Sequence, residues 1–219
     1  MNGAPPTGVD VDLMSPDVAA THAVYTSLLG RGSTNGAFGF GNGSLRFHGD
    51  GAAGHRVSFG VDNLADAQRL TKRRGLDPDE PVGVTDRIDL PLWPDADIPR
   101  LDHLVFTAPT RDHALALFGA TLDLDFRLDR HIGGDTRQLF FRAADLVVEV
   151  VVGADPAHGP TCRLWGLAWS APDIAVTHDR LISVGMAISE IRIGQKPGTR
   201  LFTVRDRALA TRTVVIGPT

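Results

Sequence analysis

The chain has 219 residues, of which 42% are hydrophobic and 22% charged, and its formal net charge is −4 at pH 7. This balance is typical of a globular protein and excludes a disordered or fibrous chain. The weakly acidic charge provides no basic field for a polyanion, so we expect no nucleic-acid partner.

The sequence also indicates where in the cell the protein is expected to be found. No apolar run approaches the roughly eighteen residues that a membrane-spanning helix requires, and the first residues lack the charged and apolar regions of a signal peptide. We therefore expect a cytoplasmic protein without a membrane partner. Cys162 is the only cysteine, which excludes an internal disulfide, and we expect it to be a small buried side chain.

Four times along the chain, an apolar strand leads through a short turn into a helical pattern that ends at glycine. Asp, Asn or Thr near the turn can cap the helix N-terminus, and glycine readily adopts the left-handed conformation that ends a helix. Strand-like runs such as RQLFFRA and DLVVEVVVG follow. The pattern predicts four β-α-β-β-β modules, whose first strands and helices span residues 9–30, 56–75, 101–119 and 164–185.

A single module cannot cover both faces of a small curved sheet, so the modules are expected to pair around a pocket. We predict an α+β fold with curved mixed sheets. Two domains follow from pairing neighbouring modules: residues 1–98 hold the first two modules, and residues 99–219 hold the last two.

The runs LDHLVF, LVVEVV, RLWGLA and KPGTRLFTVR resemble the vicinal oxygen chelate superfamily, which includes glyoxalases, extradiol dioxygenases and bleomycin-resistance proteins. The resemblance covers nearly the whole chain as a repeated module and is most specific over residues 101–217. It implies glyoxalase-like domains, with metal ligands on the first and last strands of a module. His103 and Glu149 stand at those two positions of the third module.

The other modules depart from this pattern. In the fourth, registering the two Ala-Pro ends puts Gly166 opposite His103, and registering the last strands puts Thr213 opposite Glu149. Because Gly166 and Ala168 have little side-chain volume, they can leave room for a ligand, and we place them in the pocket with Thr213 and Arg205. The alternative is that the neighbouring strand packs closer at Gly166. We expect the N-terminal modules to form a degenerate pair without metal, because Arg56 and Arg46 at the corresponding strand positions cannot be ligands.

Glu149 stands among valines, where an ionised carboxylate is costly unless it is paired or bound to metal. It is either a metal ligand or general base facing the pocket, a structural partner of Arg142, Arg163 or Arg205, or a glutamate on the solvated edge of a sheet. His103 is likewise either a ligand or a core histidine. A third ligand is expected at an open metal site, and His131 and His158 are loop candidates.

Three functions remain open. One is a metal-assisted isomerase, lyase or dioxygenase that uses a divalent ion, Zn, Fe, Mn or Ni, as a Lewis acid on a small substrate. Another is a metal-free protein that sequesters an apolar or aromatic compound. The third is a structural module, because fold does not fix function. The expected partner is a small molecule, and exposed strand edges allow a homodimer.

Overall fold

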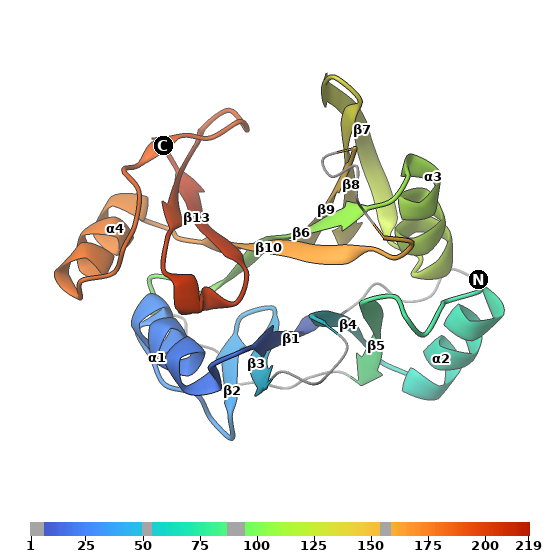
Figure 1. Cartoon of the computed structure of the whole chain (residues 1–219), viewed down its shortest axis with the longest axis horizontal. Helices are drawn as coiled ribbons and strands as arrows, with labels where there is room; N and C mark the ends of the chain where they lie inside the picture. The colour runs from blue at the N-terminus through green and yellow to red at the C-terminus, as the bar shows by residue number, and fades with distance from the viewer. Residues whose placement is uncertain (1–6, 50–53, 87–94, 154–158) are drawn as a thin grey trace. The chain divides into compact units, whose positions relative to one another are not determined.

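The computed structural model describes residues 7–49, 54–86, 95–153 and 159–219 (Figure 1). They form two compact units. The first unit comprises Met1–Val11, Ala53–Asp89 and His103–Trp165, and the second comprises Asp12–Ala52, Leu90–Asp102 and Gly166–Thr219. The first unit thus gathers the second and third modules, and the second unit gathers the first and fourth. Strands β1 (Val9–Ser15), β6 (Arg100–Ala108) and β10 (Arg163–Ser170) pass from one unit into the other. The domain boundary between residues 98 and 99 stays a prediction.

The first unit has a helix beside each of its groups of strands. Strand β6 pairs in parallel with β9, which continues antiparallel through β8 to β7, and β4 pairs in parallel with β5. The elements are β4 (Arg56–Val61), α2 (Leu64–Arg73), β5 (Val82–Asp86), α3 (Arg111–Ala114), the π-helix η1 (Leu115–Thr121), β7 (Asp125–Gly133), β8 (Thr136–Ala143) and β9 (Leu146–Val152).

The second unit repeats the four-strand order of β6, β9, β8 and β7, but its other strand pair is antiparallel. Strand β10 pairs in parallel with β13, which continues antiparallel through β12 to β11, and β2 pairs antiparallel with β3. Its elements are α1 (Val18–Leu29), β2 (Ala37–Phe40), β3 (Gly43–Gly49), α4 (Ile174–Ser183), β11 (Arg192–Ile193), β12 (Thr199–Val204), the 3-10 helix η2 (Arg207–Leu209) and β13 (Arg212–Pro218).

Each predicted helix starts where a side chain caps it. The cap residues, each accepting a hydrogen bond from a backbone N–H of the first turn, are Asp17, Asn63, Thr110 and Asp173. Gly30, Gly75 and Gly185 follow three of the helices with positive φ, as predicted.

The predicted stop of the third helix is wrong. Gly119 lies inside η1, and the chain turns only at Asp123, where φ is 60°. A Cβ at this position would lie 3.6 Å from the Phe141 ring, an ordinary contact distance, so packing does not require a glycine here.

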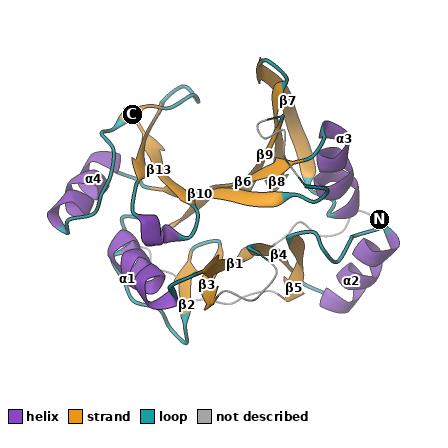
Figure 2. Ribbon diagram, viewed as in Figure 1, coloured by secondary structure: helices purple, strands orange, loops and turns teal. Residues whose placement is uncertain are grey.

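Aromatic side chains form the core between the helices and the strands. In the first unit, the Phe118 ring packs 5.1 Å from Phe106 and 5.6 Å from Phe141. In the second unit, Trp169 packs edge-on against Phe40 at 5.1 Å. The strands belong to curved mixed sheets (Figure 2), so the predicted α+β fold is confirmed. Among the described helices, none combines the length and apolar character needed to cross a membrane.

Candidate functional site

His103 and Glu149 lie on adjacent parallel strands of the first unit. The register of β6 and β9 pairs His103 with Val147 and Val105 with Glu149. Paired residues of neighbouring strands point to the same side of a sheet, so all four side chains share one face. His103 Nε2 lies 3.9 Å from Glu149 Oε2, and the two side chains are 19% and 15% exposed. The structure therefore brings the two predicted ligands together.

This shared face is the more open side of the sheet. On β9, Leu146, Val148 and Val150 are buried, whereas Val147, Glu149 and Val151 are only half-buried. On β6, Phe106 is fully buried and packs on Phe118 of the helical side. The Glu149 side chain is thus partly exposed on one face of β9, whereas the side chains on the opposite face of this strand are buried.

Two polar residues missed by the sequence analysis hold Glu149 in place. Gln138 Nε2 donates to Glu149 Oε1 at 2.5 Å, and Arg130 Nε donates to Gln138 Oε1 at 2.8 Å. Arg130 also lies over the Phe140 ring, 5.3 Å from its centroid. The signal was available in RQLFFRA, because alternation along β8 puts Gln138 and Phe140 on one face, and Phe140 pairs with Glu149.

The predicted pocket residues of the fourth module lie in the second unit. Ala168 and Thr213 are buried, and the Thr213 hydroxyl donates to the Thr211 carbonyl at 3.2 Å. Arg205 is exposed. At Gly166, a Cβ would lie 3.0 Å from the Arg212 carbonyl oxygen, so close approach of β13 explains this glycine.

Strand register also defines which residue of the fourth module corresponds to Glu149. Val105 pairs with Glu149, and Ala168, its counterpart by the Ala-Pro ends, pairs with Val214. Val214 is therefore the structural match of Glu149, one residue beyond Thr213. An apolar side chain at that position cannot bind a metal ion.

Of the two loop histidines, only His131 lies among the described residues, and it does not join the His103–Glu149 pair. His131 is exposed and hydrogen-bonds the Gly134 carbonyl within its own hairpin. His158 lies outside the described residues.

A separate cavity of about 240 Å³ lies in the first unit and does not include His103 or Glu149. Its lining comes from β4, α2, β5 and the end of η1 and is mostly apolar. The charged residues of the lining are Asp62, Asp66, Arg74 and Asp123. These polar side chains come mainly from surface positions around α2. We place the candidate chemistry at the His103–Glu149 pair, because two potential ligands converge there.

No family model matches the sequence, and no curated protein matches it either. Solved structures do match. A triple mutant of 4-hydroxymandelate synthase from Streptomyces coelicolor aligns with a TM-score of 0.72 at 14% identity, over 98% of this chain and 93% of that chain. A xylose isomerase-like TIM barrel/4-hydroxyphenylpyruvate dioxygenase fusion protein aligns with a TM-score of 0.63 at 13% identity, over 99% of this chain and 50% of that chain. The chain has the fold of the vicinal oxygen chelate superfamily, as its sequence predicts.

Proposed function

We propose that this chain binds a small molecule on the open face of β6, β8 and β9, where His103 and Glu149 hold one divalent metal ion. The convergence of His103 Nε2 and Glu149 Oε2 to 3.9 Å carries this proposal. The reaction class is isomerisation, lyase chemistry or oxygenation of a substrate with neighbouring oxygen atoms. The likeness in fold to a synthase and a dioxygenase is consistent with an enzyme of this kind.

The two side chains fit a shared metal ion. Nitrogen and oxygen ligands bind such ions at about 2.0–2.2 Å, so two ligands of one ion lie roughly 3–4 Å apart. The 3.9 Å separation falls within this range. A metal held there would act as a Lewis acid that polarises an oxygen atom of the substrate.

The neighbouring residues orient Glu149 for this role. Because Gln138 donates its hydrogen bond to Glu149 Oε1, the other carboxylate oxygen, Oε2, is the one that faces His103. Arg130 fixes the Gln138 amide through its oxygen, so the amide presents its N–H to the carboxylate. Such outer partners set ligand orientation and contribute to metal affinity. Without a metal, the same arrangement suits Glu149 to act as a general base.

Apolar side chains surround the pair. Val105 and Val147 lie on the same face as His103, and Phe140 pairs with Glu149 from β8. These groups can contact the carbon skeleton of a substrate and keep water from the reacting atoms. The face therefore suits a compact substrate with an apolar part and a chelating part.

A metal-free binding function is the second candidate. Among the described residues, one group of three His, Cys, Asp or Glu ligand atoms lies within 4.8 Å, and it contains neither His103 nor Glu149. Two protein ligands alone bind an ion weakly, whereas the apolar surroundings would suit a sequestered aromatic compound.

The test is a titration of full-length protein with Mn²⁺. Binding is measured as the loss of the electron paramagnetic resonance signal of the free ion. Mn²⁺ favours oxygen and nitrogen ligands over thiolate. We expect binding by the parent, at least tenfold weaker binding by His103→Ala and Glu149→Gln, and no change in the surface control His131→Ala. Equal affinity in the parent and both site variants would contradict a metal site here. Chelator-independent binding of small aromatic compounds would then support sequestration.

A homodimer and a cytoplasmic location also stay predictions. Strand β7 lies at an edge of its sheet, where an unpaired strand can join a second copy. Sedimentation at several protein concentrations tests the dimer, which predicts a mass of twice 23.4 kDa.

A further inference from the structure

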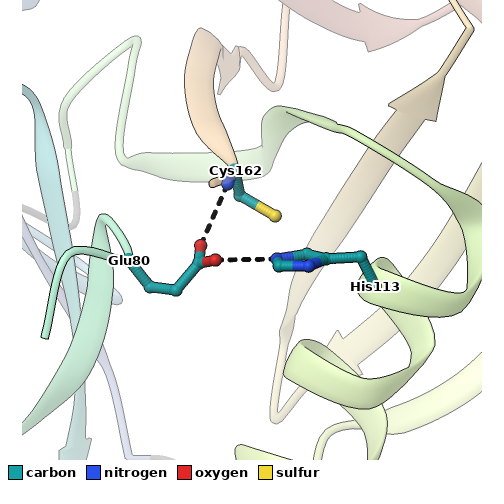
Figure 3. A group of neighbouring side chains, drawn as sticks. All are labelled: Glu80, His113 and Cys162. Carbon is teal, nitrogen blue, oxygen red and sulfur yellow. Dashed lines mark hydrogen bonds and ion pairs between the residues drawn. The ribbon is translucent and has the colours of Figure 1, made fainter. Parts of the chain in front are cut away.

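A second group of potential ligands lies in the first unit. Glu80 comes from the turn before β5, His113 from α3, and Cys162 from the segment directly before β10 (Figure 3). One ligand atom of each residue lies within 4.8 Å of the other two. Three segments that are far apart in the sequence thus bring an oxygen, a nitrogen and a sulfur atom to one point.

Direct contacts link the three residues. Glu80 Oε1 lies 2.7 Å from His113 Nε2, and Glu80 Oε2 accepts a hydrogen bond from the Cys162 backbone N–H at 3.0 Å. The Cys162 sulfur lies within 4.8 Å of a Glu80 carboxylate oxygen and of a His113 ring nitrogen. The Glu80 carboxylate therefore contacts both other residues, and the Cys162 sulfur and the His113 ring lie on the same side of it (Figure 3).

The group is buried, but it has an opening. Glu80 is 3% exposed and Cys162 is 2% exposed, whereas the His113 side chain is 31% exposed. Burial, and next the nearby charge of Glu80, raise the pKa of the Cys162 thiol. A protonated, buried thiol is a poor nucleophile and a poor target for oxidants, so a catalytic or redox role does not suit Cys162.

Metal binding suits the group better. A divalent cation would replace the thiol proton, and its two positive charges would balance the Glu80 carboxylate and the Cys162 thiolate. The buried site would then carry no net charge when His113 is neutral, which lowers the cost of burying each charge. Zinc accepts carboxylate, imidazole and thiolate ligands together in tetrahedral sites, and a water on the His113 side can fill the fourth position.

We propose that Glu80, His113 and Cys162 form a binding site for Zn²⁺ or a similar thiolate-binding divalent cation, separate from the His103–Glu149 pair. On binding, the Cys162 S–H bond breaks, the sulfur becomes a metal ligand and one proton passes to solvent. No oxidant or reductant takes part. The ion cross-links the turn before β5, α3 and the segment before β10, so it stabilises the first unit.

The test uses full-length protein without an affinity tag, freed of metal with a chelator and titrated with Co²⁺ and then Zn²⁺. We expect a thiolate-to-cobalt charge-transfer band in the near ultraviolet that saturates at one equivalent, disappears on addition of Zn²⁺ and is accompanied by proton release. Zn²⁺ should also raise the Tm of the parent. Cys162→Ala should abolish the band, and His113→Ala and Glu80→Gln should weaken Co²⁺ binding about tenfold or more.

Two sets of controls keep the result interpretable. His103→Ala and Glu149→Gln should keep the cobalt band, because they lie at the other pair, so failure of one site is distinguished from failure of the other. Circular dichroism of each metal-free variant establishes that it is folded, and Glu80→Gln keeps the size of the side chain for this reason. Absence of a saturable band in the parent, or an unchanged band in folded Cys162→Ala, would overturn the proposal and leave the group as a hydrogen-bonded core cluster.

Discussion

The two compact units share a four-strand arrangement, a parallel pair continued by two antiparallel strands, but they differ in chemistry. In the first, β6 and β9 pair in parallel with Val105 opposite Glu149, and in the second, β10 and β13 pair in parallel with Ala168 opposite Val214. The first unit places His103 beside the carboxylate, whereas the second has Gly166 at the matching position. The same backbone register therefore supports a polar site in one unit and close packing in the other, which illustrates that site chemistry is not set by fold.

The units also differ in how their paired helix ends are held. In the second unit, Arg180 donates to the Ser27 and Leu28 carbonyls at the end of α1 at 2.8 and 2.7 Å, and to Asp97 at 2.5 Å. In the first unit, Arg74 reaches the Thr121 carbonyl at only 3.4 Å. In the second unit, short hydrogen bonds from Arg180 thus hold the helix end. In the first unit the corresponding Arg74 contact is longer, and the Glu80–His113–Cys162 group links further segments.

The largest expected effects come from the matched core positions Phe106 and Trp169. Both are fully buried, and by the Ala-Pro ends they occupy equivalent places in β6 and β10. Phe106→Ala and Trp169→Ala should each lower the free energy of unfolding by about 3–5 kcal/mol, because each leaves a cavity. Urea unfolding measures this effect.

Metal binding by these two variants sharpens the comparison between the units. Phe106 lies on the strand that carries His103, so Phe106→Ala should also weaken Mn²⁺ binding. Folded Trp169→Ala should bind Mn²⁺ like the parent. An equal loss of Mn²⁺ affinity in both folded variants would contradict the assignment of the chemistry to the first unit.

The substitution Gly166→His tests whether the second unit can bind a metal ion when a histidine is placed at this position. The added Cβ would lie 3.0 Å from the Arg212 carbonyl oxygen, so the strand must shift, and we expect a loss of about 1–3 kcal/mol in the free energy of unfolding. Gly166→Ala is the matched control for the steric part. Isothermal titration should find no additional metal equivalent, and one extra equivalent in Gly166→His alone would show that the pocket is open at this position.

The helix-end arginines offer a smaller contrast. Arg180→Ala removes three hydrogen bonds from charged donors and should cost about 2 kcal/mol, whereas Arg74→Ala should cost less than about 1 kcal/mol. Thermal unfolding of both variants tests the order. A larger effect at Arg74 would mean that the helix-end contacts of the first unit are the stronger ones.

The sequence predicted the repeated features of this fold because they depend on local residues. Caps such as Asp17 and Asp173 act on the next few backbone N–H groups, and period-two alternation along LVVEVVV placed Glu149 on a strand. Gly119 misled the prediction because the helical turns continue through this glycine as the π-helix η1, which ends at Thr121.

The candidate sites could be predicted only in part, since most of their contacts join distant segments. His103 and Glu149 were found because both stand in strands with a family-like pattern. The Glu80–His113–Cys162 group has no such signal, because Glu80 lies in a turn and its partners follow 33 and 82 residues later. Cys162 was expected to be small and buried, and burial alone did not indicate what it contacts.

The smallest expected effect concerns Asp129, which ties α3 to the strands of the first unit. Its carboxylate accepts hydrogen bonds from Arg111 Nε at 2.7 Å and from Arg137 at 2.7 and 2.9 Å. These arginines, Arg111 first, hold the pKa of Asp129 below its usual range. The stabilisation is therefore fully present above the unfolded pKa of about 3.9 and is lost as the pH falls through the lower folded pKa.

Asp129→Asn should accordingly lower the free energy of unfolding at neutral pH, and the gap from the parent should narrow below about pH 4 as the parent carboxylate becomes protonated. Urea unfolding at several pH values measures the gap, with the exposed Asp112→Asn as a control for the general change in charge. Because α3 also carries His113, a loss of Zn²⁺ affinity in Asp129→Asn that is absent in Asp112→Asn would show that this ion pair positions the helix for the buried ligand group. A gap that stays constant with pH would instead assign the effect to the lost hydrogen-bond geometry and not to the charge.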